Sequence, residues 1–120
     1  MKFEFTAKSV VSYIEDDVCV VSFADTPGDE PEKYLILSQA LFDSGDDDEA
    51  VSIEYGENGD SVTTEVVSAR LYSKSFVLEV DPAIAGVSEF RISMASPADE
   101  ELREHLKKVF SKSPGKLALL

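Results

Sequence analysis

The sequence predicts one α+β domain over residues 1–120. We expect a mostly antiparallel sheet of about six to seven strands, with one C-terminal amphipathic helix packed on one face. The chain has 120 residues, 43 % of them hydrophobic, which is enough for a single core and too apolar for a disordered acidic tail. Apolar and polar residues alternate in short runs within residues 2–94, as they do in half-buried strands. A helical period occurs over about residues 97–112, and a tail follows at 113–120.

The first two predicted strands are joined by an acidic turn at residues 15–17. Alternation over residues 3–14 is interrupted at the adjacent Val10 and Val11, which indicates a bend or a bulge. Residues 18–24 are β-branched and apolar, as in a central strand. We therefore expect these two segments to form a hairpin.

The remaining strands follow from the same alternation and from the turn residues between them. Two prolines and a glycine mark residues 25–33 as a loop. The Asn58-Gly59 dipeptide tolerates positive φ at both central positions of a tight turn, so it predicts a hairpin between the strands that flank it. The strands are expected at residues 34–37 with an extension up to 42, 51–55, 62–71, 76–80 and 87–94.

The C-terminal helix has both a start signal and an apolar stripe. Ser96 is a good N-cap, Pro97 suits the first helical position, and Asp99 stands where a capping box has its acid. Acids precede bases along the segment, which complements the helix dipole. The Ser-Pro-Gly sequence at 113–115 should end the helix. The stripe consists of Ala98, Leu102, Leu106, Val109 and Phe110.

The negative charge is concentrated in one segment. The formal net charge is −13, and residues 15–65 hold 16 acids against one base, Lys33, so this segment alone carries −15. Two interpretations are open: the acids lie in solvated loops and are screened from one another, or they form an acidic face that meets a basic protein. Because acids repel phosphate, nucleic acid and anionic membranes are not expected as partners.

We expect a cytoplasmic protein. The first ten residues have no uninterrupted apolar run of the kind that a signal peptide requires. No later stretch approaches the roughly 18 apolar residues of a membrane-spanning helix. The single cysteine, Cys19, can form neither an intramolecular disulfide nor a cysteine-based zinc site, which agrees with a reducing compartment.

The residues offer little for catalysis. His105, the single histidine, falls at the edge of the helical stripe, and no acid or base partner for it is identifiable. Cys19 lies within an apolar strand and is interpreted as a buried small hydrophobe. The six glycines are scattered singly, without a phosphate-binding pattern. We therefore expect neither an enzyme nor a cofactor.

The acids between residues 43 and 54 are the candidates for a divalent-cation site, because hard cations prefer oxygen ligands. As a calcium loop starting at Asp43 the segment fails, since Gly45 occupies the third position and Asp48 stands where the sharp turn needs glycine. We therefore expect no EF-hand and assign no metal site. Glu54 and Glu65 could face each other across the predicted hairpin, and their repulsion would favour an interface with a basic group between them.

Several short motifs resemble one known family. The strand Tyr34–Gln39 precedes an acid-rich loop and the strand Val51–Tyr55, and Leu71 is followed by the strand at residues 76–82. In this order the chain resembles the immunity protein 10 family of bacterial polymorphic toxin systems, over roughly residues 3–112. In place of the glycine-rich stretch associated with that family, this chain has residues 56–65.

The resemblance implies binding and not catalysis: a protein that neutralises a cognate toxin, expected to be basic, by covering it with an acidic surface. Tyrosines are enriched at binding hot spots. The candidate contact residues are Asp46, Asp47, Asp48, Glu49, Glu54 and Glu57, with Tyr34 and Tyr55 as aromatic anchors. Two alternatives stay open: a small-ligand or divalent-metal-binding domain, and a homo-oligomeric scaffold whose apolar tail at 117–120 and a sheet edge form a homodimer.

Overall fold

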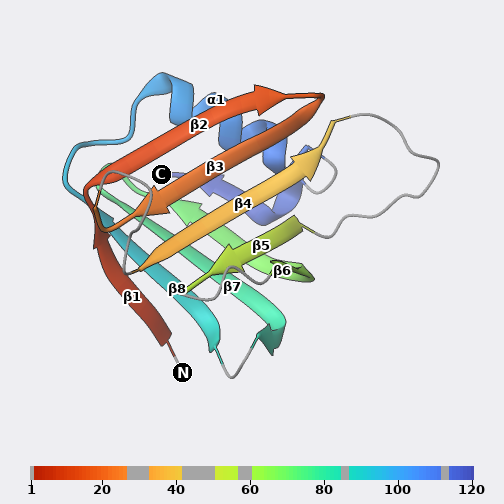
Figure 1. The fold of residues 1–120 in the computed structure, drawn as a ribbon, viewed down its shortest axis with the longest axis horizontal. Coiled ribbons are helices and arrows are strands. Elements are labelled where there is room, and N and C mark those ends of the chain that lie inside the picture. Colours follow the sequence, from red (N-terminus) through yellow and green to blue (C-terminus); the bar gives the residue numbers. More distant parts are fainter. Residues whose placement is uncertain (1, 27–32, 42–50, 57–60, 85–86, 112–113) are drawn as a thin grey trace.

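The computed structural model describes residues 2–26, 33–41, 51–56, 61–84, 87–111 and 114–120. Over these ranges the fold is α+β with mostly antiparallel strands and one α-helix, as predicted (Figure 1). The elements are β1 (Lys2–Ala7), β2 (Ser9–Glu15), β3 (Val18–Ala24), β4 (Tyr34–Ala40), β5 (Val51–Tyr55), β6 (Ser61–Leu71), β7 (Ser75–Ile84), β8 (Val87–Met94), α1 (Glu100–Val109), the 3-10 turn η1 (Pro114–Lys116) and β9 (Leu117–Leu119).

The prediction of six to seven strands was too low, because the described residues form nine. The first predicted strand is divided at Lys8, where the chain bends between β1 and β2. The bend or bulge predicted at Val10 and Val11 is not there, because both residues pair with β3 in unbroken register. The apolar tail adds the ninth strand, since β9 pairs with the end of β6 in parallel, a partner that local alternation does not show.

The strands form two sheets that share β6. Along the hydrogen-bonded path the order is β1-β8-β7-β6-β5-β4-β3-β2. The first residues of β6, Ser61–Thr64, pair with β5, whereas Glu65–Leu71 pair with β7 after a register shift between Val66 and Ser68. We call the group β2–β5 with the start of β6 sheet B, and the group of β1, β8, β7, β9 and the rest of β6 sheet A. Figure 1 shows sheet B in front, with its strands crossing those of sheet A.

Two predicted hairpins are present, and one pairing was unforeseen. β2 and β3 are joined by Asp16 and Asp17, with φ of 52° and 60°, as a two-residue turn of the primed type requires. β5 and β6 pair antiparallel on either side of the Asn-Gly dipeptide, which lies outside the described ranges. β1, in contrast, pairs in parallel with β8.

The core lies between the inner faces of the two sheets. The Phe23 ring on β3 stacks on the Phe76 ring on β7, with centroids 5.2 Å apart and planes 12° from parallel, so this pair joins sheet B to sheet A. Both rings are fully buried. A second aromatic group contains Phe3, Tyr55 and Phe90, whose centroids are 5.0 to 5.9 Å apart in tilted and edge-on arrangements.

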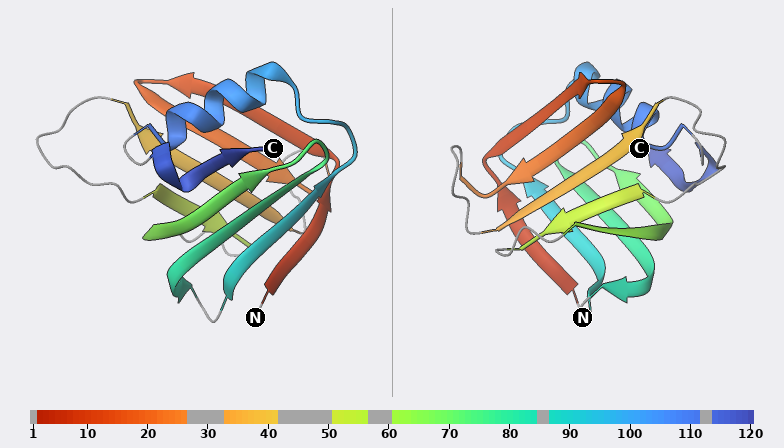
Figure 2. Two further views of the ribbon diagram at one scale, coloured as in Figure 1. Left: turned by 180° about the vertical axis from the view of Figure 1, so that it is seen from behind. Right: turned by 45° about the vertical axis from the view of Figure 1, so that its right-hand side comes forward.

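The helix covers the inner face of sheet B at one end (Figure 2). It contacts β3 most, and β2 and β4 equally on either side. Its buried residues, Leu102, Leu106 and Val109, belong to the predicted stripe. None of the helices in the described part of the chain is long and apolar enough to cross a membrane.

The predicted helix start at Ser96 was wrong. The N-cap is Asp99, whose carboxylate accepts a 2.8 Å hydrogen bond from the Leu102 amide, and the helix ends at Val109. Residues 95–98 make tertiary bonds instead: the Ala95 amide donates to the Ala7 carbonyl, and the Ala98 amide donates to the Ser73 carbonyl. These bonds hold the segment against sheet A, so the first helical turn begins only after Asp99.

Candidate protein-binding surface

The outer face of sheet B is the side turned away from the core. Along β3 the side chains of Cys19, Val21 and Phe23 are buried, whereas those between them are half-exposed, and β4 follows the same alternation. Strand register extends the half-exposed set across the sheet. This outer face consists of Ser9, Val11, Tyr13, Glu15, Val18, Val20, Ser22, Ala24, Tyr34, Ile36, Ser38, Ala40, Ser52 and Glu54.

This face is mainly apolar and hydroxylic. Val11 is 51 % exposed and Tyr13 is 43 % exposed, both on the outermost strand β2. Tyr13 lies opposite Val20, and Val11 lies in a row with Ser22 and Ile36. Exposed apolar surface of this kind is typical of an interaction site rather than of a solvated sheet.

Acids gather at one end of the face. Glu15, Asp16 and Asp17 are all exposed at the turn between β2 and β3. The Leu41 amide donates a 2.7 Å hydrogen bond to the Asp17 carbonyl, so the chain leaves β4 beside this turn, and it returns at the start of β5 on the same side. The sequence between these two points holds Asp43, Asp46–Asp48 and Glu49, which lie outside the described residues. We call residues 15–17 together with these attachment points the acidic end of sheet B.

The segment that carries the charge is also the segment that builds sheet B. Residues 15–65, with their net charge of −15, run from the end of β2 through β3, β4 and β5 into β6. The residues on either side, which supply sheet A apart from Glu65 and also most of β2, sum to +2. Most of the acids stand in the sequence between the strands of sheet B, since β3 and β4 themselves hold no charged residue.

The structure distributes the predicted contact residues over three places. Tyr34 and Glu54 both lie on the outer face of sheet B, in adjacent strands. Tyr55 points to the inner side, where its ring packs against Phe3 and Phe90. The remaining predicted residues, Asp46, Asp47, Asp48, Glu49 and Glu57, lie outside the described ranges.

The expected meeting of Glu54 and Glu65 does not occur. Glu54 lies opposite Ser61 in β6, and Glu65 lies opposite Asp81 in β7. The two glutamates are therefore separated by the point where β6 passes from sheet B to sheet A. Sequence spacing alone could not locate this passage.

Sequence reasoning missed Val11, Tyr13, Val20 and Ile36 as surface residues. A signal was present, because both alternating sets of β3 are apolar, and one set of a two-sided apolar strand can remain at the surface. Which set faces outward follows only from the position of sheet A and the helix.

Cys19 and His105 both join the helix to sheet B. The Cys19 thiol is fully buried and donates to the His105 backbone carbonyl, with a sulfur–oxygen distance of 3.4 Å. Burial raises the pKa of this thiol, an effect that the nearby positive charge of Lys108 partly offsets. The His105 ring nitrogen Nδ1 lies 2.5 Å from the Ser12 hydroxyl on β2. Through these contacts both residues hold the helix against sheet B, which is a structural role.

No cluster of three or more metal-ligating side chains occurs among the described residues, and the acidic segment at 43–49 is not part of them. No family model matches the chain, and no match was found among curated proteins.

Proposed function

We propose that this chain is a non-catalytic binding protein that neutralises a basic protein, a bacterial toxin, by covering it with the outer face and the acidic end of sheet B. The observation that carries the proposal is the exposed apolar strip of Val11 and Tyr13 beside the exposed acids of residues 15–17. Protein interfaces commonly have an apolar and aromatic centre with a charged rim. The resemblance to immunity proteins supplies the class of partner.

The two parts of the surface contribute differently. The charge of −15 in residues 15–65 attracts a basic protein over a long range and accelerates encounter. The apolar side chains, once desolvated, hold the complex together and slow its dissociation. As an immunity protein the chain would act in the cytoplasm of the cell that makes the toxin.

Neutralising two acids tests the electrostatic part. Asp16→Asn with Asp17→Asn removes two charges, and asparagine tolerates the positive φ of both positions, so the turn is kept. The matched control, Glu4→Gln with Glu100→Gln, removes two exposed charges from other elements. The partner to use is the toxin domain of a secreted protein encoded beside this chain, tested by co-expression for rescue of growth and by surface plasmon resonance for kinetics.

We expect rescue of growth by the unaltered chain, and a several-fold slower association of the Asp16/Asp17 variant at low salt that disappears at high salt. The control variant should associate nearly as fast as the unaltered chain. Extending the substitutions to Asp46, Asp47, Asp48 and Glu49 should deepen the effect. Unchanged kinetics in both acidic variants at low salt would exclude the acidic end, and failure of the unaltered chain to rescue growth would exclude toxin neutralisation of that partner.

A further inference from the structure

Strand β2 forms an edge that is apolar on both sides. Among the described strands it pairs only with β3. Its central residues Val10, Val11, Tyr13 and Ile14 are between 37 % and 51 % exposed. Proteins usually protect an edge strand with charge, proline or a bulge, and residues 10–14 contain none of these. This edge is therefore suited to pairing with a further strand.

The turn to β3 decides which residues of β2 can accept a new strand. In a two-residue hairpin the flanking residues, here Glu15 and Val18, form a hydrogen-bonded pair, and hydrogen-bonded and non-hydrogen-bonded pairs then alternate. Val11 and Tyr13 consequently direct their backbone groups toward β3. Val10, Ser12 and Ile14 direct their N–H and C=O groups away from it, toward the open edge.

The sequence of β2 is self-complementary about Ser12. On either side of Ser12 stand Val11 and Tyr13, then Val10 and Ile14. Further out, the exposed Lys8 is matched by the exposed Asp16. We infer that β2 pairs antiparallel with β2 of a second copy of this chain, about a two-fold axis at Ser12. The new contacts use the edge of β2, and they share Val11, Tyr13 and Asp16 with the binding face proposed above.

The pairing gives partners to the outward backbone groups, the apolar side chains and the charged side chains of β2 and its ends. Ser12 lies opposite Ser12 of the second copy, and Val10 lies opposite Ile14, so the outward backbone groups of both copies form one ladder. Val11 meets Tyr13 on the outer side, an apolar cross-strand pair. Lys8 of each copy comes next to Asp16 of the other, which fixes the register because a shifted pairing loses this match.

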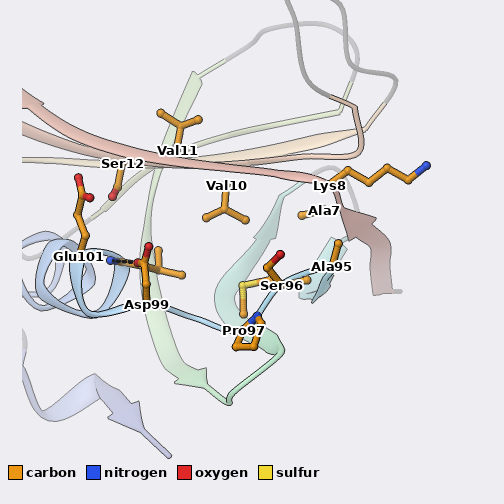
Figure 3. A pocket seen from close by; sticks show the side chains of 12 residues that line it. Ala7, Lys8, Val10, Val11, Ser12, Ala95, Ser96, Pro97, Asp99 and Glu101 are labelled. Carbon is orange, nitrogen blue, oxygen red and sulfur yellow. Dashed lines mark hydrogen bonds between the residues drawn. The ribbon is translucent and has the colours of Figure 1, made fainter.

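A cavity of about 430 Å³ beside β2 agrees with this arrangement (Figure 3). Val10 points into it and Val11 points away, while Pro97 lies on the opposite wall and Met94 and Leu102 also line the space. Ile14 of the second copy lies next to Val10 on the same side of the joined sheet, so its side chain covers the apolar part of this cavity. Helix α1 packs mainly on β3, and Val10 and Ile14 on β2 remain 37 % and 44 % exposed.

Sedimentation velocity over a concentration series of the full chain tests the inference. The unaltered chain should approach twice its monomer mass at protein concentrations up to about 1 mM, the range expected for a small interface. Because each copy carries −13, added salt should strengthen this association, whereas it should weaken binding to a basic partner. The opposite salt dependences make failure of this inference distinguishable from failure of the proposed function.

Two pairs of variants complete the test. Ser12→Pro removes an outward N–H without breaking a bond to β3 and should abolish the dimer, while Ser12→Ala removes only the hydroxyl beside His105 and should keep it. Ile14→Glu should abolish the dimer, while Val67→Glu, at an exposed apolar position on β6, should not. Circular dichroism checks that each variant is folded. A chain that stays monomeric up to about 1 mM, or a dimer that persists in both Ser12→Pro and Ile14→Glu, would overturn the inference.

Discussion

The outer faces of the two sheets differ in how they meet solvent. The outer side of sheet A carries Glu4, Arg70, Glu79, Glu89 and Arg91. Among the described residues it holds the ion pairs Arg70–Glu79 at 2.9 Å and Arg91–Glu89 at 2.8 Å. The outer side of sheet B carries valine, tyrosine, isoleucine and serine, with Glu15 and Glu54 as its charged residues within the described ranges.

The difference shows that one core supports two surfaces of different composition. On sheet A, Glu79 lies directly opposite Glu89, and each glutamate is neutralised by its own arginine. The hydrogen bond and the charge of Glu89 raise the pKa of Arg91. Sheet A thus makes a solvated face with balanced charge, whereas sheet B keeps apolar groups at the surface, with Glu15–Asp17 at one end and Glu54 near the other.

The largest expected effect comes from the core that the two faces share. Phe23→Ala removes the ring stacked on Phe76 and should lower the free energy of unfolding by about 3–5 kcal/mol, because a buried cavity remains. Tyr13→Ala, on the exposed outer face, should lower it by less than about 1 kcal/mol. Urea denaturation measures both. Two separate unfolding transitions instead of one would show that the two sheets unfold independently and do not share one core.

Placing a charge on each outer face should separate binding from stability. Val20→Lys introduces a cation at the centre of sheet B and should weaken binding to the basic toxin domain at least about tenfold, or about 1.4 kcal/mol. Thr6→Lys places the same group on the exposed outer side of sheet A and should leave binding almost unchanged. Surface plasmon resonance with both variants makes the comparison. Equal losses of affinity in the two variants would show that the outer faces of sheets A and B do not differ in binding.

The buried Cys19, on the inner side of sheet B, should make the free energy of unfolding depend on pH. Burial raises the pKa of Cys19, so the folded protein disfavours the thiolate relative to the unfolded chain. The stability that depends on this thiol is fully present below the unfolded pKa, near 8.5, and is lost as pH rises toward the folded value, by at most about 1.4 kcal/mol per pH unit. Denaturation between pH 7 and about 10 should show a steeper decline for the unaltered chain than for Cys19→Ser. Parallel curves would contradict the proposed cause.

The smallest effect should come from the ion pairs of sheet A. Arg70→Gln removes the partner of Glu79, but the two side chains are 37 % and 39 % exposed, so the loss should be below about 1 kcal/mol. The difference from the unaltered chain should shrink in high salt, as denaturation at two ionic strengths would show. A larger loss that salt does not reduce would mean that this face contributes to stability and not only to solvation.

Alternation in the sequence was sufficient for several strands. β5 and β8 begin and end at the predicted residues, because each has one buried and one exposed side. The same alternation distinguishes the two tyrosines. Tyr55 falls on the same side of its strand as the buried Val51 and Ile53, whereas Tyr34 falls on the side opposite to the buried Leu35. For the candidate surface, therefore, the inward position of Tyr55 was predictable in principle.

Other features depend on partners that are distant in sequence. Alternation in β1 shows that Phe3 and Phe5 share a side, but not that β8 is the neighbour. Ser96 and Asp99 are both good N-caps by residue type, and the hydrogen bonds of Ala95 and Ala98 to other elements decide between them. Both sides of β3 are apolar, and which of them faces outward could not be predicted, because it is set by where sheet A and α1 come to lie.

The parallel pairing of β1 with β8 has a consequence for the order of folding. Sheet B is assembled from hairpins between successive strands, so its contacts can form while the chain is still being synthesised. β1 leaves the ribosome before all of these strands, yet its partner is the last strand before the helix. Contacts between such distant segments close large loops and slow folding. β1 must therefore remain unpaired until β8 has been synthesised, and its apolar residues Phe3 and Phe5 are exposed to other chains during that time.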